Sequence, residues 1–291
     1  MSDKLFDLIE SMSQIEKKHF SNFASMNVKN KETDYLKLYK MIEKGKKYDE
    51  AKIKKSFKGN LSSKKNRLTH KILESLNVMY ADKKLETELK QCLNFISILF
   101  DKKQFKELVS QLRTAKTKAL KCESFLILIE LVDWEKKILI EQSPKNLEEQ
   151  YLNLIEEESK YITALTEVKA FENLHRKLNI LLYKDTQCSK PESKKQLLEY
   201  YESDLLQKPQ KNILSDRSKY YYCRCISAIN IRLKDFEKAL QFSEMLVELV
   251  EKSYLKEDRQ LYKQGLCNLL TCCSSLKKRI CLMRTIPSFE S

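Results

Sequence analysis

Hydrophobic residues recur along most of the chain at intervals of three and four positions, the spacing that lines one face of an α-helix. From about residue 85 onward, this pattern predicts long helices joined by short polar connections. We expect them over residues 85–101, 104–120, 124–142, 146–158, 161–183, 194–206, 213–233, 236–251 and 258–276. Because short connections make adjacent helices pack antiparallel, the sequence predicts a series of helical hairpins.

The first 80 residues show the same spacing in shorter segments. Helices are expected over residues 4–12, from Ser13 onward, and over residues 34–43, 49–57 and 62–79. Ser13 and Glu16 have the spacing of a capping box, in which each side chain accepts a hydrogen bond from the other residue's backbone N–H. We therefore divide the chain into a small helical domain, residues 1–82, and an array of longer helices, residues 83–291.

Glycine and proline are scarce, with three glycines and four prolines among 291 residues. Both residue types interrupt helices and build tight turns, so their scarcity favours an all-α fold. It also excludes the glycine-rich loops that hold phosphate groups in many nucleotide-binding enzymes. Such chains are scaffolds or binding surfaces more often than enzymes.

The chain also lacks signals for a membrane or a secretory route. No stretch reaches the roughly 18 apolar residues that cross a bilayer, and acidic residues stand where a signal peptide is apolar. The nine cysteines are odd in number and fall mostly at apolar helical positions. This pattern is typical of reduced, buried thiols, so we expect a cytoplasmic protein with no membrane contact.

One segment carries a repeat-like pattern of small and aromatic residues. A small residue, Ser227, is followed nine positions later by Phe236 and three positions after that by Ala239. This spacing resembles the tetratricopeptide repeat, in which small residues let two helices cross closely. The segment departs from the family at Asn230 and Ser243, where aromatic residues are usual.

Two further segments echo that pattern. Gly265 is again small and mid-helix, 38 residues after Ser227, and a weaker echo joins Ile96, Phe105 and Leu108. Over its full length the chain resembles uncharacterised bacterial helical-repeat proteins. The resemblance implies helical hairpins stacked as a tetratricopeptide-like α-solenoid, preceded by the small basic N-terminal domain. A compact helical bundle is the alternative architecture.

Composition and resemblance together predict a non-enzymatic scaffold or adaptor that binds another protein in a helical-repeat groove. The net charge of +14 favours a protein or peptide partner with an acidic surface. Lysines that only solvate the outer faces of helices would give the same charge. The candidate partner-binding residues are Tyr220, Tyr221, Arg224 and Arg232, together with Tyr222.

The alternative function is a nucleic-acid-binding regulator. Residues 1–80 hold eighteen Lys or Arg and ten Asp or Glu, and residues 49–76 read as helix, turn, helix. Gly59 falls in the turn, and Ser62 or Ser63 is expected to cap the second helix, whose N-terminal end is basic. The candidate residues for binding DNA or RNA are Lys54, Lys55, Lys58, Lys64, Lys65 and Arg67.

The metal and catalytic motifs are weak. Glu16 and His19, like Glu172 and His175, are three residues apart and share a helix face, as in di-iron bundles. Only fifteen residues precede Glu16, which leaves no room for the additional long helix that such bundles place first. No cysteine set supplies four converging zinc ligands. We therefore expect no metal, cofactor or catalytic residue, and an α-helical enzyme is the least favoured alternative.

Overall fold

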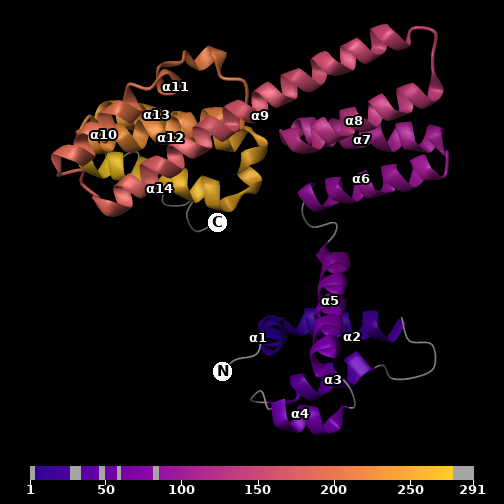
Figure 1. The fold of residues 1–291 in the computed structure, drawn as a ribbon. Coiled ribbons are helices and arrows are strands. Elements are labelled where there is room, and N and C mark those ends of the chain that lie inside the picture. Colours follow the sequence, from indigo (N-terminus) through magenta and orange to yellow (C-terminus); the bar gives the residue numbers. More distant parts are fainter. Residues whose placement is uncertain (1–3, 27–33, 46–49, 58–59, 81–84, 278–291) are drawn as a thin grey trace. The chain divides into compact units, whose positions relative to one another are not determined.

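The computed structural model describes residues 4–26, 34–45, 50–57, 60–80 and 85–277. Within these ranges the chain forms fourteen α-helices and two short 3₁₀ helices, and no strand (Figure 1). This confirms the all-α prediction. Contacts between Cα atoms divide the chain into residues 1–91 and residues 92–291. The expected boundary between residues 82 and 83 lies outside the described residues.

The first unit is built around one central helix. Its helices are α1 Lys4–Ser11, α2 Gln14–Met26, α3 Asp34–Glu43, α4 Glu50–Ser56 and α5 Leu61–Tyr80. Helices α2 and α3 both pack against α5 (Figure 1). Phe20, Tyr39, Leu68 and Ile72 are almost completely buried between them. The rings of Phe20 and Tyr39 meet edge to face, with their centroids 4.7 Å apart.

Two helix starts in this unit test the expected caps. The capping box at α2 is confirmed, because the Ser13 N–H donates to Glu16 Oε2 at 2.6 Å and the Glu16 N–H donates to Ser13 Oγ at 3.3 Å. The cap expected at Ser62 or Ser63 is wrong. Helix α5 begins at Leu61, and Asn60 Oδ1 accepts a hydrogen bond from the Ser63 N–H at 3.3 Å. Asparagine is as good an N-cap as serine, and Asn60 precedes Ser62 by two residues.

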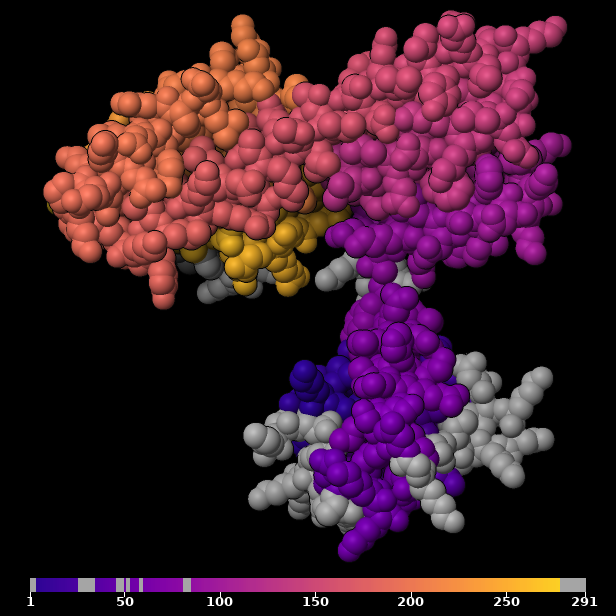
Figure 2. Space-filling model, viewed as in Figure 1, coloured from indigo at the N-terminus to yellow at the C-terminus, as the bar shows by residue number. Residues whose placement is uncertain are grey.

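The second unit holds the longer helices. They are α6 Leu85–Asp101, α7 Phe105–Lys121, α8 Phe125–Gln142, α9 Leu147–Lys184, α10 Pro191–Tyr201, α11 Asp204–Gln207, α12 Asp216–Leu233, α13 Phe236–Lys252 and α14 Arg259–Ser275, with 3₁₀ helices η1 Gln210–Asn212 and η2 Tyr254–Glu257. The division between the two units falls within α6, so only its part from residue 92 onward belongs to the second unit. Side chains fill the spaces between these ribbons in the space-filling view (Figure 2). These bounds agree with the periodic pattern to within about three residues, except at α9 and α10.

Helix α9 corrects the sequence analysis. Two helices were expected, over residues 146–158 and 161–183, and the structure has one helix of 38 residues. No glycine or proline stands between residues 158 and 161, so nothing interrupts the backbone hydrogen bonds there. The opposite error occurs over residues 194–206, where one helix was expected and the structure has two, α10 and α11.

The two halves of α9 pack against different partners. Its first half meets α8, where the rings of Phe125 and Tyr161 lie 6.5 Å apart. Its second half meets α12, where the ring of Phe171 lies edge-on to Tyr222 at 6.0 Å. Figure 1 shows α9 running from the α7–α8 end of this unit to the α10–α14 end. One helix, α9, therefore packs both in the layer that contains α7 and α8 and in the layer that contains α12–α14.

Helices α12, α13 and α14 cross at small residues. Ser227 on α12 and Ser243 on α13 are fully buried, and their hydroxyl oxygens are 2.7 Å apart. Gly265 on α14 faces Leu246 on α13 so closely that an added Cβ would overlap the Leu246 side chain. Leu246 is itself buried and cannot swing away into solvent. Close packing is therefore the reason for a glycine in the middle of this helix.

Replacing Gly265 by Ala should destabilise the protein. Alanine favours a helix over glycine by about 1 kcal/mol, but forcing a methyl group into a packed core costs about 1–3 kcal/mol. We expect a net loss of about 1 kcal/mol in the free energy of unfolding, measured by urea denaturation.

The matched test removes the obstructing side chain. In a Leu246→Ala background the Gly265→Ala change should no longer destabilise, because the added methyl group has space. A Gly265→Ala protein more stable than the wild type would show that the two helices are not in close contact at this point.

Candidate functional site

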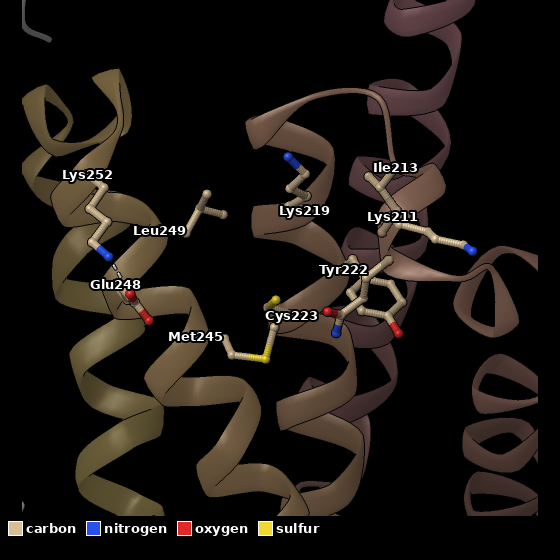
Figure 3. Close-up of a pocket in the computed structure, with 10 residues that line it drawn as sticks. Lys211, Ile213, Lys219, Tyr222, Cys223, Met245, Glu248, Leu249 and Lys252 are labelled. Atoms are coloured by element: carbon tan, nitrogen blue, oxygen red, sulfur yellow. Dashed lines mark hydrogen bonds and ion pairs between the residues drawn. The ribbon is translucent and has the colours of Figure 1, made fainter.

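A groove between α12 and α13 combines apolar and charged side chains. Its volume is about 390 Å³, within the range of ligand-binding pockets. Its walls come from both helices and from the segment around η1 (Figure 3). The lining residues are Gln210, Lys211, Ile213, Lys219, Tyr222, Cys223, Met245, Glu248, Leu249 and Lys252.

Helical spacing brings these side chains to the groove. On α12, Lys219 and Cys223 are four residues apart and therefore lie on one face. On α13, Met245, Leu249 and Lys252 form a matching stripe at positions i, i+4 and i+7. The two stripes face each other across the gap in Figure 3. The groove is thus a channel between two antiparallel helices, which the η1 segment bounds on one side.

The floor of the groove is apolar and uncharged. Ile213, Tyr222 and Cys223 are buried, while Met245 and Leu249 are partly exposed toward the opening. Burial raises the pKa of the Cys223 thiol to about 12, because the charged thiolate would lose its hydration. The thiol therefore stays protonated at neutral pH, and the floor offers hydrophobic contact with no charge.

The rim of the groove is basic. Lys211, Lys219 and Lys252 surround the opening, and the lining includes one carboxylate, Glu248. Glu248 forms an ion pair with Lys252 at 2.5 Å, and Lys219 approaches the Asp216 carboxylate at 3.3 Å. These pairs are solvent-exposed, so each contributes little to stability. The lining as a whole has an excess of positive charge beside an apolar floor.

Two carboxylates from distant parts of the chain hold the walls of the groove in place. Glu167 of α9 is buried, accepts a hydrogen bond from the Leu214 N–H at 2.8 Å, and forms an ion pair with Lys208. Glu123 accepts from the backbone N–H groups of Asp216 at 2.8 Å and Arg217 at 3.1 Å. Glu123 thus places negative charge at the N-terminus of α12, where the helix dipole favours it.

Of the residues predicted from sequence to bind a partner, Tyr222 lines the groove, and the others on α12 lie outside its lining. Tyr220 is fully buried, and its hydroxyl group donates to the Leu261 carbonyl oxygen at 3.2 Å. Arg224 donates to the Tyr220 hydroxyl at 3.1 Å and to Gln264 Oε1. Tyr221 is half-buried and stacks at an angle on His175, with the rings 5.5 Å apart. None of these three lines the groove.

Arg232, the remaining residue of that prediction, is also outside the groove lining. Its Nε atom is buried without a hydrogen-bond partner, as is Nε of Arg224. Tyr220 in particular acts as a packing residue in this structure, so we leave it out of the candidate site. Whether Tyr221, Arg224 or Arg232 contacts a partner stays a prediction.

Of the residues predicted to bind nucleic acid, Lys64, Lys65 and Arg67 lie in the first two turns of α5, and Lys54 and Lys55 lie in the last turn of α4. Lys54 and Lys55 are exposed, and Lys54 pairs with Glu50 at 2.9 Å. Lys64 lies 5.2 Å from the ring of Phe57, and Arg67 lies 5.6 Å from that of Tyr35. A hollow of about 290 Å³ is lined by Tyr35, Asn60, Ser63, Lys64 and Arg67. Lys65 is half-buried, and Lys58 lies outside the described residues.

The Glu-x-x-His pairs have other partners than a metal. His19 Nδ1 lies 2.9 Å from the Ser75 hydroxyl, and Glu16 closes the cap of α2. Glu172 is bound by Lys169 and Arg176 on its own helix. His175 is buried and its ring lies against that of Tyr221 on α12. Among the described residues, no cluster of three or more His, Cys, Asp or Glu could hold a metal ion.

No protein-family model, curated protein or solved structure matches the chain. The helices packed one against the next are compatible with a helical-repeat fold. In the described part of the chain, no helix is both long enough and apolar enough to cross a bilayer.

The sequence analysis named Tyr222 but missed the other lining residues, because it looked for basic and aromatic residues on α12 alone. The available signal was the stripe on α13, in which Met245 and Leu249 are followed by Lys252 on the same helix face. An apolar stripe that ends in a lysine is common on solvated helices, so it marks a groove only once the facing helix is known. The η1 segment, which has no periodicity, could not be placed from sequence at all.

Burial of His175 predicts a pH-dependent stability. Its pKa falls to about 4, chiefly because burial disfavours the charged ring and because Arg224 and Arg176 lie nearby, while Glu172 acts in the opposite direction. In the unfolded chain the His175 pKa has its ordinary value of about 6.5. Between about pH 6.5 and pH 4 this histidine is therefore mostly protonated in the unfolded chain and mostly neutral in the folded protein. Stability is therefore expected to fall as the pH drops from about 6.5 toward 4.

We expect His175→Gln to remove this dependence. Between pH 7 and pH 5 the wild type should lose about 2 kcal/mol more than the variant in the free energy of unfolding, measured by urea denaturation at each pH. The matched control is His70→Gln, which changes an exposed histidine and should leave the pH profile unchanged. Equal pH profiles for wild type and His175→Gln would show that this ring is accessible to protons in the folded state.

Proposed function

We propose that the chain is a non-enzymatic interaction protein whose α12–α13 groove receives an acidic peptide segment of a partner protein. The observation that carries this proposal is the groove itself, with an apolar floor of Tyr222, Cys223 and Met245 beneath a rim of lysines. Apolar contact supplies affinity, and the lysines favour a segment rich in Asp or Glu.

The packing order of the helices supports a tetratricopeptide-like stack as the architecture behind this groove. The second half of α9 packs on α10 and α12, α12 packs on α13, and α13 packs on α14. In such a stack α9, α12 and α14 are the first helices of successive hairpins, while α10 and α13 are the second helices. The buried Ser227 and Ala239 then occupy the small-residue positions of one repeat.

The chemistry of the groove favours binding over catalysis. The Cys223 thiol is protonated at neutral pH because burial raises its pKa, and an activated cysteine needs the opposite shift. Glu248 is exposed and paired with Lys252. The lining thus provides anchoring contacts and charge, the two properties that a peptide-binding groove requires. A cytoplasmic location remains a prediction of the sequence.

The proposal is tested by selecting peptides from a random display library on the full chain. Enriched peptides should combine acidic residues with a large apolar residue. The triple variant Lys211→Glu, Lys219→Glu, Lys252→Glu should bind them at least about tenfold more weakly, because it reverses the charge of the rim.

The control reverses three exposed lysines outside the groove, Lys177, Lys195 and Lys263, and gives the same net charge. Circular dichroism checks that both variants stay folded. If the control loses as much affinity as the groove variant, attraction to the overall charge explains binding and the groove is not the site.

The cluster at the start of α5 supports a second candidate, binding of nucleic acid. Lys64 and Arg67 border a hollow near the N-terminal turn of a long helix, where a phosphate group would find cations and backbone N–H groups. Tyr35 lines the same hollow but is buried beneath Arg67, so the hollow offers positive charge and no exposed ring. Under this alternative, residues 49–76 contact the nucleic acid directly.

This alternative predicts that the full chain binds duplex DNA with an affinity that falls steeply as salt rises. The variant Lys64→Glu, Lys65→Glu, Arg67→Glu should abolish binding in an electrophoretic or fluorescence assay, while the Lys177, Lys195, Lys263 control should bind as the wild type does. No binding by the wild type at about 50 mM salt, or equal loss in both variants, would contradict it.

A further inference from the structure

The floor of the α12–α13 groove contains two sulfur-bearing side chains. Cys223 and Met245 both direct their sulfur atoms into the gap between the two helices, as Figure 3 shows. Sulfur atoms are polarisable and make favourable contacts with the edges of aromatic rings. Methionine also has three rotatable bonds, so Met245 can adapt its shape to a flat ring.

The groove residue Tyr222 belongs to a row of three aromatic rings that are in edge-to-face contact. The ring of Tyr222 lies edge-on to Phe171 at 6.0 Å on one side and to Phe242 at 5.9 Å on the other. Edge-to-face contacts pair the positive edge of one ring with the negative face of the next. Tyr222 lines the groove, so a further ring seated there would extend the same row.

The rim adds a requirement for negative charge close to the ring. In Figure 3 the ammonium group of Lys219 lies at the opening above the sulfur atoms. Its partner Asp216 is on the same helix, 3.3 Å away, and both side chains are substantially exposed. An exposed pair of this kind is weak, so a carboxylate on the ligand can compete for Lys219.

We infer that the groove selects an aromatic side chain flanked by a carboxylate, so that the partner's anchor is Phe, Tyr or Trp next to Asp or Glu. This inference rests on the proposed function and specifies its ligand. The two sulfur atoms and Tyr222 contact the ring, and Lys219 contacts the carboxylate. An aliphatic anchor of equal area would gain the hydrophobic contact alone.

The probes for this inference are small carboxylates that differ only in the ring. We compare 3-phenylpropionate with 3-cyclohexylpropionate and octanoate, and use 3-phenylpropan-1-ol as the uncharged analogue. The full chain carries isotope-labelled methyl groups on Ile, Leu and Met, so that Ile213, Met245 and Leu249 report occupation of the groove by NMR. Chemical-shift titrations give a dissociation constant for each probe.

We expect 3-phenylpropionate to bind about threefold to tenfold more tightly than 3-cyclohexylpropionate, although the cyclohexyl ring is the more hydrophobic. Met245→Leu keeps the volume and removes the sulfur atom, so it should reduce this ratio by about half or more. Met79→Leu is the matched control in the first unit and should leave the ratio unchanged. Lys219→Met should weaken the binding of all three carboxylates, and Lys263→Met should weaken none of them.

The outcomes separate the inference from the proposed function. If cyclohexylpropionate or octanoate binds as tightly as phenylpropionate, and Lys219→Met weakens all three, the groove is an anionic-ligand site but the aromatic preference is wrong. A preference for octanoate would indicate a fatty-acid-like ligand. If no carboxylate shifts the methyl signals of Ile213, Met245 or Leu249, both the inference and the proposed groove are wrong.

Discussion

Close approach of helix backbones at small side chains is the constraint on which the C-terminal part of the fold depends. Ser227 and Ser243 share a hydrogen bond where α12 crosses α13, and Gly265 brings α14 against Leu246. Larger residues at these positions would separate the helices and widen the space between their outer stripes. The dimensions of the α12–α13 groove therefore depend on contacts in the core that never touch a ligand.

Most of the fold could be predicted from the spacing of hydrophobic residues, because that spacing acts within each helix. Helix α7, for example, was expected over residues 104–120 and forms over Phe105–Lys121. The errors arose where two local preferences compete. Asn60 and the serines after it are all good caps, and only the packing of Leu61 into the core decides which one begins the helix.

The candidate site was harder to predict, because it is assembled from residues that meet only in three dimensions. The sequence analysis named Tyr220 and Tyr222 together, and the structure places the Tyr220 ring in the core and Tyr222 in the lining of the groove. Two positions along a helix turn a side chain by about 200°, so the two rings point to different sides of α12. Contacts such as Glu123 with the start of α12 span 93 residues and leave no trace in local patterning.

The continuity of α9 has a consequence for modularity. Tandem repeats are commonly gained, lost or exchanged as whole hairpins, because each hairpin ends in a loop where the chain can be rejoined. In this protein a 38-residue helix takes the place of such a loop between the α7–α8 layer and the α12–α14 layer. Any exchange of one layer would have to cut a hydrogen-bonded helix and expose an apolar stripe on each side of the cut. Replacing one layer alone would therefore disrupt the packing of the other, so the two layers form one structural unit.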